Sequence, residues 1–339
     1  MKKHKISILA LLFSFVMAAS IFSGCGSSKN GDKSLKKVRL NEVARSVFYA
    51  PMYAAINEGM FKKQGLEIDI TTGQGADKTM QTVLSKNADI GFCGPEQVIY
   101  IYNQKREDYP ILFAQMTTTD GSFMVSRKDE KNFKWQDLKG KNIIGGRPGG
   151  VPEMALEYAL RKNKVEPGKD VNIITNLAYT ATSGAFKSGT GDYVALFEPT
   201  ASMLEKDKNG YIVASVGGAS GSLPYTCYFA TKSYISQNPD VIKKFTKAIY
   251  EGQVWVQKHS DKEVAESIKS FFPGTDEGIL ESVVKNYRSI NAYALTPEIK
   301  QENLDRLMDI IQSYKSSLIP QRPPFEKIVD NSFAKEAVK

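Results

Sequence analysis

The stretch from residue 87 to residue 97, NADIGFCGPEQ, constrains the fold of this chain more than any other. Its pattern predicts a strand over 88–92, a tight turn at Cys93 and Gly94, and a helix with Pro95 in its first turn. Glycine allows the sharp turn, and proline favours the first turn of a helix. Such a unit directs the free N–H groups of a helix start out of the carboxyl end of a strand, where open α/β sheets bind ligands.

The same strand–turn–helix pattern recurs near 46–51, 73–78, 147–153 and 198–202. Strands alternate with helices between residues 38 and 126, which predicts a parallel, doubly wound sheet that includes strands over 111–116 and 122–126. A charged segment over 128–132 follows, and the alternation then starts again. The apolar stretch 225–231 predicts a strand that returns the chain to the first unit. Two α/β units joined by two crossings therefore predict a bilobed, hinged molecule.

The remaining segments are expected to be helical or irregular. We predict one continuous helix over 51–63, a glycine-serine loop over 217–221, and C-terminal helices over 239–255, 262–271, 276–289 and 297–318. Asn238 and Pro239 provide the cap and the first residue of the first C-terminal helix.

The N-terminus has the pattern of a signal peptide over residues 1–24, with three lysines followed by an apolar run. That run is short for a transmembrane helix. The residues Phe22-Ser23-Gly24-Cys25 resemble a bacterial lipobox, in which the cysteine becomes the lipid-bearing N-terminus; a plain secretory signal is the alternative. The segment 26–34 is rich in glycine, serine, lysine and asparagine, so 25–37 is interpreted as a lipidated cysteine and a flexible tether.

Charge and cysteine content narrow the function further. Removing residues 1–24 takes away three of the 45 basic residues, which leaves 42 against 37 acidic residues and a net charge of +5. This mild, scattered charge gives little support to nucleic-acid binding. We expect Cys93 and Cys227 to be free, buried thiols, although an exported protein permits a disulfide. We also expect the protein to be a monomer.

The residues just described resemble, over essentially the whole mature chain, the solute-binding lipoproteins of ABC importers, in the alkanesulfonate-, nitrate- and thiamin-pyrimidine-binding group. The resemblance rests on EGMFKKQGL from Glu58, NADIG from Asn87, DLKGK from Asp137 and NPDV from Asn238. It implies a type II periplasmic-binding-protein-like α/β fold with two doubly wound lobes and a two-strand hinge. Lobe 1 would comprise 38–126 plus 225–339, and lobe 2 would comprise 127–224. Partners would be a small-molecule ligand and a membrane permease, with no cofactor or metal.

Ligands of this family bind at the strand-end turns, so residues in those turns are the predicted ligand contacts. Aromatic rings among them would stack on a planar ligand, glycines would expose backbone N–H groups, and Glu96, Arg147 and Glu198 would provide charge. For each residue a purely structural role is the alternative. The set is Ser46, Phe48, Tyr49, Gly73, Gln74, Gly75, Cys93, Gly94, Glu96, Thr117, Arg147, Gly149, Gly150, Glu198 and Tyr225.

The mixed charge of these turns favours a neutral or donor-bearing aromatic ring, such as a thiamin-like pyrimidine, over a sulfonate- or nitrate-type anion. A ligand-sensing receptor lipoprotein is an alternative of another class. A pyrimidine-synthesising enzyme of the same fold is disfavoured, because the cysteine-rich motif and the active-site histidine of that branch have no counterpart here. His259 lies beside Ser260 and Asp261, but no GxSxG nucleophile motif accompanies it.

Overall fold

The computed structural model describes residues 34–339, and residues 35–339 form one compact unit. The predicted signal peptide and the lipidation site Cys25 lie outside the described residues. The predicted tether over 25–37 extends two residues too far, because the first strand already begins at Lys36. No helix among the described residues is both long enough and apolar enough to span a bilayer.

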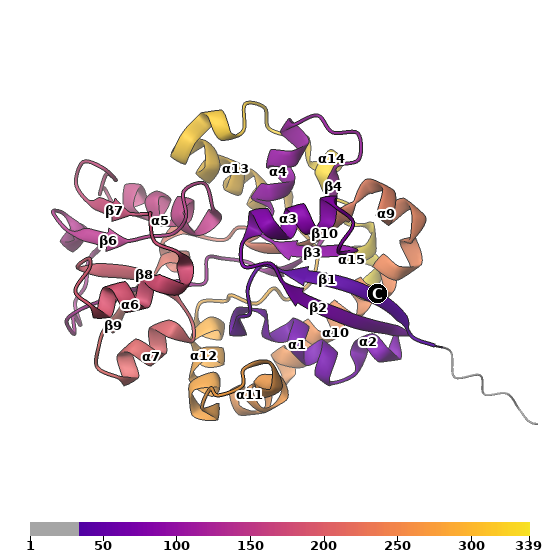
Figure 1. Cartoon of the computed structure of the whole chain (residues 1–339), viewed down its shortest axis with the longest axis horizontal. Helices are drawn as coiled ribbons and strands as arrows, with labels where there is room; N and C mark the ends of the chain where they lie inside the picture. The colour runs from indigo at the N-terminus through magenta and orange to yellow at the C-terminus, as the bar shows by residue number, and fades with distance from the viewer. Residues whose placement is uncertain (1–33) are drawn as a thin grey trace, which may run out of the picture. The chain divides into compact units, whose positions relative to one another are not determined.

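Five strands form the first sheet, in the order β2-β1-β3-β10-β4 (Figure 1). β1 is parallel to both β2 and β3, as the repeated strand–turn–helix units predict. β10 is antiparallel to β3 and to β4, so β1 to β4 all run in one direction, as predicted, and β10 makes the sheet mixed. This strand enters from the second lobe and therefore runs the opposite way, and its return to the first unit is confirmed. The strands are β1 Lys36–Glu42, β2 Leu66–Thr72, β3 Ile90–Cys93, β4 Pro110–Thr117 and β10 Thr226–Thr231.

The second sheet repeats this plan in the order β7-β6-β8-β5-β9. Its three parallel strands are β6 Asn142–Ile144, β7 Asn172–Ile174 and β8 Tyr193–Phe197. β5 (Ser122–Ser126) pairs antiparallel with β8 on one side and with β9 (Tyr211–Ser215) on the other. In each sheet, therefore, the fourth position is taken by a strand that arrives through a crossing from the other lobe.

The position of β5 corrects the sequence analysis, which counted 122–126 as a fifth strand of lobe 1. Every residue of this strand is buried, so its sequence identifies a central strand without identifying the sheet that contains it. The first crossing between the sheets consequently lies before Ser122 rather than after Ser126. The predicted lobe limits at 127 and 225 otherwise stay a proposal.

Helices cover both sheets, and most of their starts follow the predicted turns (Figure 1). The helix expected over 51–63 is interrupted at Gly59, whose φ of +71° ends the first helical segment. In the N-terminal part the helices are α1 Ala50–Asn57, α2 Met60–Lys63, α3 Ala76–Leu84 and α4 Glu96–Asn103. In the second lobe they are α5 Val151–Lys162, α6 Thr182–Lys187, α7 Thr200–Lys206 and α8 Val216–Ser220.

The short helix α8 replaces the loop predicted over 217–221. Ser215 provides its N-cap, because the Ser215 hydroxyl accepts a hydrogen bond from the Gly218 N–H at 3.1 Å. A Cβ on Gly217 would lie 2.1 Å from the carbonyl oxygen of Asp120, so only glycine allows this close approach. The glycines that suggested a loose loop are therefore explained by close packing against the first crossing.

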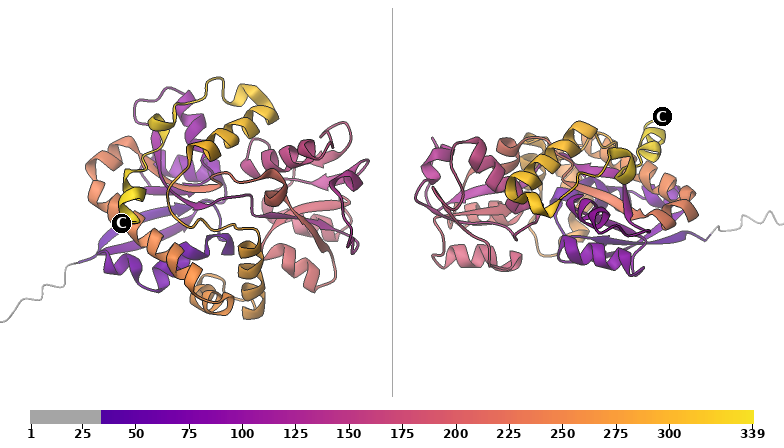
Figure 2. Two further views of the ribbon diagram at one scale, coloured as in Figure 1. Left: turned by 180° about the vertical axis from the view of Figure 1, so that it is seen from behind. Right: turned by 90° about the horizontal axis from the view of Figure 1, so that it is seen from above.

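The C-terminal third of the chain, coloured orange to yellow, packs beside the first sheet (Figure 2). The long helix α10 (Pro239–Lys258) lies against α1, and a Cβ on Gly252 would lie 2.3 Å from the Pro51 carbonyl oxygen. The predicted helical character of this region is confirmed. The other elements are α9 Lys232–Gln237, α11 Asp261–Ile268, α12 Glu277–Ser289, α13 Gln301–Lys315, α14 Phe325–Ile328 and α15 Ser332–Ala337.

Apolar packing continues from the first lobe into the second. One large core cluster contains Phe48 and Tyr287 together with Phe123 and Leu196 of the second sheet, and a smaller cluster lies beneath α5. This shared core includes Leu223 and Tyr225 of the second crossing. The strand-end turns of both lobes are thus held on a common, closely packed support.

Candidate functional site

The strand-end turns of the two lobes contact each other. The Ser46 hydroxyl lies 3.5 Å from the Glu198 carbonyl oxygen, and the Tyr100 hydroxyl donates to the Gly149 carbonyl oxygen at 3.1 Å. The Arg147 guanidinium lies 3.9 Å from the Asp77 carboxylate. Each of these pairs joins a residue of the first lobe to one of the second. Among the predicted site residues, these contacts place Ser46 beside Glu198 and bring Arg147 and Gly149 to the first lobe.

The turn after β1 places Ser46, Phe48 and Tyr49. The Ser46 hydroxyl accepts from the Phe48 N–H at 3.2 Å and caps a short 3-10 turn. Phe48 is fully buried, and its ring centroid lies 5.6 Å from that of Tyr225 and 4.9 Å from that of Tyr287. This packing favours the structural alternative for Phe48. Tyr49 is also almost fully buried, with its ring 4.6 Å from that of Phe92.

The turn after β2, which contains Gly73, Gln74 and Gly75, is held by close packing. Gln74 has a positive φ of 58°. A Cβ on Gly73 would lie 2.5 Å from the Thr79 hydroxyl oxygen and 2.7 Å from the Asn41 side-chain oxygen. Gly75 precedes α3 and its carbonyl oxygen accepts from the Thr79 N–H at 2.9 Å. These contacts explain the glycine at position 73 without a ligand.

The carboxylate of Glu96 has a hydrogen bond to only one of its two oxygens. It lies in the first turn of α4, after Cys93 and Gly94, and only 1% of its surface is exposed. Its Oε1 accepts from the Gln97 side chain at 3.2 Å, whereas its Oε2 is buried without a hydrogen-bond partner. Burial raises the pKa of Glu96 to about 7, an effect that the nearby positive charge of Arg147 partly opposes. Cys93 is a buried, free thiol, as is Cys227.

The turn after β6 contains Arg147, Gly149 and Gly150. The side chain of Arg147 is 51% exposed, and Gly149 adopts a left-handed φ of +74°. Gly150 is the N-cap residue of α5. Glu153, which the sequence analysis left out of the site, is completely buried in the first turn of that helix.

Glu153 resembles Glu96 in its environment. Its Oε2 accepts from the Gly146 N–H at 2.7 Å, whereas its Oε1 is buried without a partner. Burial raises the pKa of Glu153 to about 7. A Cβ on Gly145 would lie 2.3 Å from Glu153 Oε2, so the glycine allows the carboxylate to fold over the turn.

Glu198 follows β8 and forms a cis peptide bond with Pro199. Its Oε1 accepts from the Ser202 hydroxyl at 2.7 Å and from the Asn286 side-chain amide at 2.8 Å, and its Oε2 accepts from the Ser202 N–H at 2.8 Å. Its backbone N–H donates to the Tyr287 hydroxyl at 3.1 Å. Both carboxylate oxygens of Glu198 are therefore occupied, and the residue connects β8 to helix α12.

The two crossings bring Thr117 and Tyr225 together. The Thr117 carbonyl oxygen accepts from the Tyr225 N–H at 3.1 Å, and the Thr117 hydroxyl accepts from the Thr226 N–H at 2.9 Å. Thr117 is fully buried, so its position favours a structural role. Asp120, in the first crossing, is also fully buried, and burial raises its pKa to about 6.

Tyr179 is an aromatic residue of this region that the sequence analysis missed. It is 59% exposed, and its ring lies 6.1 Å from that of Phe197. Surrounding protein raises its pKa, and the negative charge of Asp120 raises it further. An exposed aromatic ring in this region suits stacking on a planar ligand. Tyr179 begins a short 3-10 turn between β7 and α6, and no motif in the sequence identified it.

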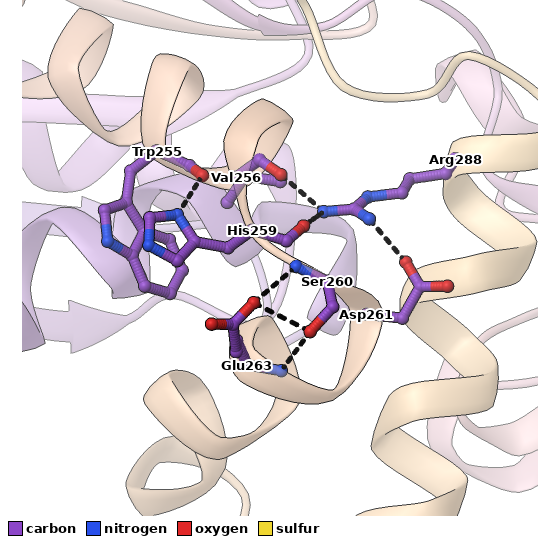
Figure 3. A network of polar contacts seen from close by, with 7 residues as sticks. All are labelled: Trp255, Val256, His259, Ser260, Asp261, Glu263 and Arg288. Atoms are coloured by element: carbon purple, nitrogen blue, oxygen red, sulfur yellow. Dashed lines mark hydrogen bonds and ion pairs between the residues drawn. The ribbon is translucent and has the colours of Figure 1, made fainter.

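The residues around His259 have structural roles (Figure 3). His259 Nδ1 lies 2.8 Å from the Trp255 carbonyl oxygen, and the two rings stack at 3.9 Å. Ser260 caps α11 through reciprocal bonds with Glu263, and Asp261 pairs with Arg288 at 2.6 Å. No Ser-His-Asp triad is formed by these neighbours. Among the described residues, no group of three or more acidic, histidine or cysteine side chains is arranged to hold a metal ion.

The family model described as NMT1/THI5 like matches residues 47–263. This chain belongs to the NMT1/THI5-like family. YtlA of Bacillus subtilis (strain 168), described as a candidate binding protein, is 43% identical over 305 residues, which cover 90% of this chain and 91% of YtlA. The high identity over nearly the full length of both proteins makes this relationship close.

Proteins that match this NMT1/THI5-like chain at lower identity have names that describe different activities. The alkanesulfonate-binding protein SsuA from Xanthomonas axonopodis pv. citri, solved bound to MOPS, superimposes with a TM-score of 0.69 at 14% identity, covering 87% of this chain and 98% of SsuA. This match shows the fold. A 4-amino-5-hydroxymethyl-2-methylpyrimidine phosphate synthase of Candida albicans (strain WO-1) is 22% identical over 290 residues, covering 76% of this chain and 81% of the synthase. The bilobed α/β fold of periplasmic binding proteins is confirmed.

Proposed function

We propose that this protein is the extracytoplasmic solute-binding component of an ABC importer, anchored through Cys25. It captures a small aromatic heterocycle with hydrogen-bond donors, similar to the pyrimidine of thiamin, between its two lobes and delivers the compound to a membrane permease. Membership of the NMT1/THI5-like family, the close relationship to YtlA and the fold shared with SsuA support a solute-binding role. The signal-peptide and lipobox patterns support export and anchoring.

The observation that carries the choice of ligand is the buried, unpartnered Oε2 of Glu96. A buried acceptor without a hydrogen bond is unfavourable by about 1–3 kcal/mol, and a ligand N–H group would remove that penalty. Glu153 Oε1 is an acceptor of the same kind. In their ionised forms, these two carboxylates favour a ligand that donates hydrogen bonds.

The same charges disfavour a small oxyanion. Arg45 is paired with Glu42 at 2.7 Å, and Arg147 lies near both Asp77 and Glu96. A sulfonate or nitrate would have to bind among carboxylates of its own sign, which costs free energy in a partly buried site. The half-exposed guanidinium of Arg147 beside a glycine turn is the observation that supports the anion alternative.

A thermal-shift screen of residues 26–339, which include the whole compact unit, tests the proposal. The compounds are thiamin, 4-amino-5-hydroxymethyl-2-methylpyrimidine, ethanesulfonate and nitrate. A ligand at about 100 times its Kd stabilises the folded state by about 2.7 kcal/mol, which corresponds to a Tm increase of roughly 4 °C for a chain of this size. We expect this increase with the pyrimidine, and a reduced increase in Glu96→Gln.

The anion alternative predicts the opposite pattern. A Tm increase with ethanesulfonate or nitrate alone, lost in Arg147→Ala, would contradict the proposed heterocyclic ligand. The proposed role as a component of an ABC importer would still stand. If none of the four compounds raises the Tm, the proposed ligand class is wrong. The exposed variant Lys285→Ala on α12 serves as the control, because Lys285 lies on the solvent side of that helix.

A further inference from the structure

The two cysteines in the described part of the chain lie directly opposite each other on neighbouring strands. Cys93 ends β3, Cys227 is the second residue of β10, and the antiparallel register of these strands pairs them. Residues that face each other in such a ladder have Cα atoms about 4.5–5.5 Å apart, and disulfides span Cα separations of about 4.4–6.8 Å. The backbone therefore places the two residues within bridging distance.

The next residues of the same two strands show that opposed side chains share a face of the sheet. The rings of Phe92 and Tyr228, one pair further along the ladder, stack with their centroids 4.3 Å apart. A Cβ on Gly91 would lie 2.2 Å from the ring of Phe229, its partner in the register. Because side chains alternate between the two faces along a strand, the two cysteines extend together on the face that Phe229 occupies.

The structure shows the reduced form of this pair, in which both thiols are fully buried and unbonded. The Cys93 thiol donates to the carbonyl oxygens of Ala76 and Gly94 over sulfur–oxygen distances of 3.7 and 3.5 Å. A thiol is a weak hydrogen-bond donor, so turning this sulfur toward the neighbouring strand costs little. These contacts therefore do not prevent the two sulfurs from joining.

We propose that Cys93 and Cys227 form a cross-strand disulfide when the protein folds outside the cytosol, where disulfides persist. The bond joins β3, which leads into the turn before Glu96, to β10, which follows the second crossing. It also closes a loop that contains the entire second sheet. This inference goes beyond the proposed function, from which it takes only the export of the protein.

Thiol–disulfide exchange with a low-molecular-weight disulfide, such as oxidised glutathione, forms the bond. One cysteine thiolate attacks the oxidant, which gives a mixed disulfide and releases one glutathione. The second cysteine then attacks the protein sulfur of the mixed disulfide and releases the other glutathione. The protein loses two electrons and two protons, and the oxidant takes them up to become two molecules of glutathione.

This exchange belongs to the folding of the chain. Burial raises the pKa of both thiols well above its ordinary value, so few thiolates exist in the folded protein, and oxidants do not reach them. Before β3 and β10 are covered, both thiols titrate normally and react. We therefore expect the bond to form during refolding and to form only slowly in protein that has already folded with reduced thiols.

The experiment uses residues 26–339, which contain these two cysteines and lack Cys25. The protein is unfolded in urea and refolded either in dithiothreitol or in a glutathione buffer with the reduced form in excess. Free thiols are then alkylated with N-ethylmaleimide in urea before mass spectrometry. From the glutathione buffer we expect a chain about 2 Da lighter than the reduced chain, without added alkyl groups or glutathione. Its Tm should exceed that of the protein refolded in dithiothreitol by about 3–6 °C.

The matched controls are Cys93→Ser and Cys227→Ser. Each retains a single thiol, so neither can form the internal bond, and the Tm of each should be the same after refolding in either buffer. Two alkylated cysteines in the wild type, or glutathione adducts in place of the internal bond, would overturn this inference. That comparison uses the wild type alone, so it holds even if a variant does not fold. Solute binding is not measured here, and the proposed function would stand after either result.

Discussion

At the scale of single residues, Glu96 shows how glycine and burial together produce an unusual carboxylate. A Cβ on Gly94 would lie 2.0 Å from Glu96 Oε2, so the carboxylate folds over the preceding turn only because that residue is glycine. In this position burial raises the pKa of Glu96 from 4.5 to about 7. Between about pH 4.5 and pH 7, Glu96 therefore keeps its proton in the folded state and has lost it in the unfolded state.

This difference predicts the pH dependence of stability. Below about pH 4.5 Glu96 is protonated in both states, and its contribution is most favourable. As the pH rises to about 7, the unfolded state releases the proton first, and about 2–3 kcal/mol of stability is lost. Glu96→Gln cannot titrate, so we expect it to gain that amount relative to the wild type between pH 5 and pH 8. Urea denaturation of the ligand-free protein at both pH values measures the change.

The control for this prediction is Glu281→Gln, on the exposed side of α12. It should follow the wild type at both pH values. A constant difference in unfolding free energy between Glu96→Gln and the wild type from pH 5 to pH 8 would show that Glu96 titrates normally in the folded protein.

At the scale of secondary-structure elements, Arg288 joins three helices (Figure 3). From α12 its guanidinium donates to the carbonyl oxygens of Val256 and His259 at the end of α10, and it pairs with Asp261 at the start of α11 at 2.6 Å. Carbonyl groups at a helix end lack intrahelical partners, so a cation there is favourable. The same helix α12 carries Asn286, which bonds to Glu198 of the second lobe.

Removing this connection should destabilise the protein. Arg288→Ala leaves two helix-end carbonyls and one carboxylate without their partner, and we expect a loss of about 2–4 kcal/mol in unfolding free energy. Urea denaturation at pH 7 measures it. Lys285→Ala, one turn earlier on the exposed side of α12, should change the value by less than about 0.5 kcal/mol. Equal stability of Arg288→Ala and the wild type would contradict the role given to this arginine.

The sequence is informative about elements where local chemistry decides their limits. The turns at Gly94 and Gly150 and the helix start at Pro239 were predicted from glycine and proline alone, and the helices begin there. The sequence is uninformative where the pairing of strands decides which sheet contains an element. The strand 122–126 is buried on all sides, so nothing in it distinguishes one sheet from the other. The antiparallel direction of β10 is likewise visible only in the folded chain, because a strand has no directional signal of its own.

The same limit applies to the candidate site. Glu96, Arg147 and Tyr225 follow or precede recognisable strands, and the sequence analysis selected them. Glu153 is not among the predicted contacts, although the turn before its helix is. Tyr179 lies in a short 3-10 turn that no sequence motif marks. The closeness of Asp120 to Tyr225 depends on two crossings separated by about 100 residues, as the Leu223–Thr118 bond shows. Only the folded chain brings such residues together.

At the scale of the whole described unit, two contacts join the lobes beside the candidate site. The Tyr100 hydroxyl on α4 donates to the Gly149 carbonyl oxygen at 3.1 Å, and Asp77 on α3 lies 3.9 Å from Arg147. The first contact uses a half-buried tyrosine, whereas both partners of the second are half exposed. Screening by water weakens the ion pair, so the hydrogen bond contributes more to holding these two turns together.

The last prediction concerns ligand release. Lobes that separate before the ligand leaves must break the Tyr100–Gly149 bond, so Tyr100→Phe should favour separation by about 1 kcal/mol and raise the dissociation rate about 5-fold. Stopped-flow displacement of 4-amino-5-hydroxymethyl-2-methylpyrimidine measures this rate. The control, Tyr102→Phe, alters a tyrosine of the same helix whose ring packs edge-on against Tyr109, away from Gly149. Equal dissociation rates in Tyr100→Phe and the wild type would mean that the Tyr100–Gly149 contact does not change when the ligand leaves. The contact would then have no role in ligand release.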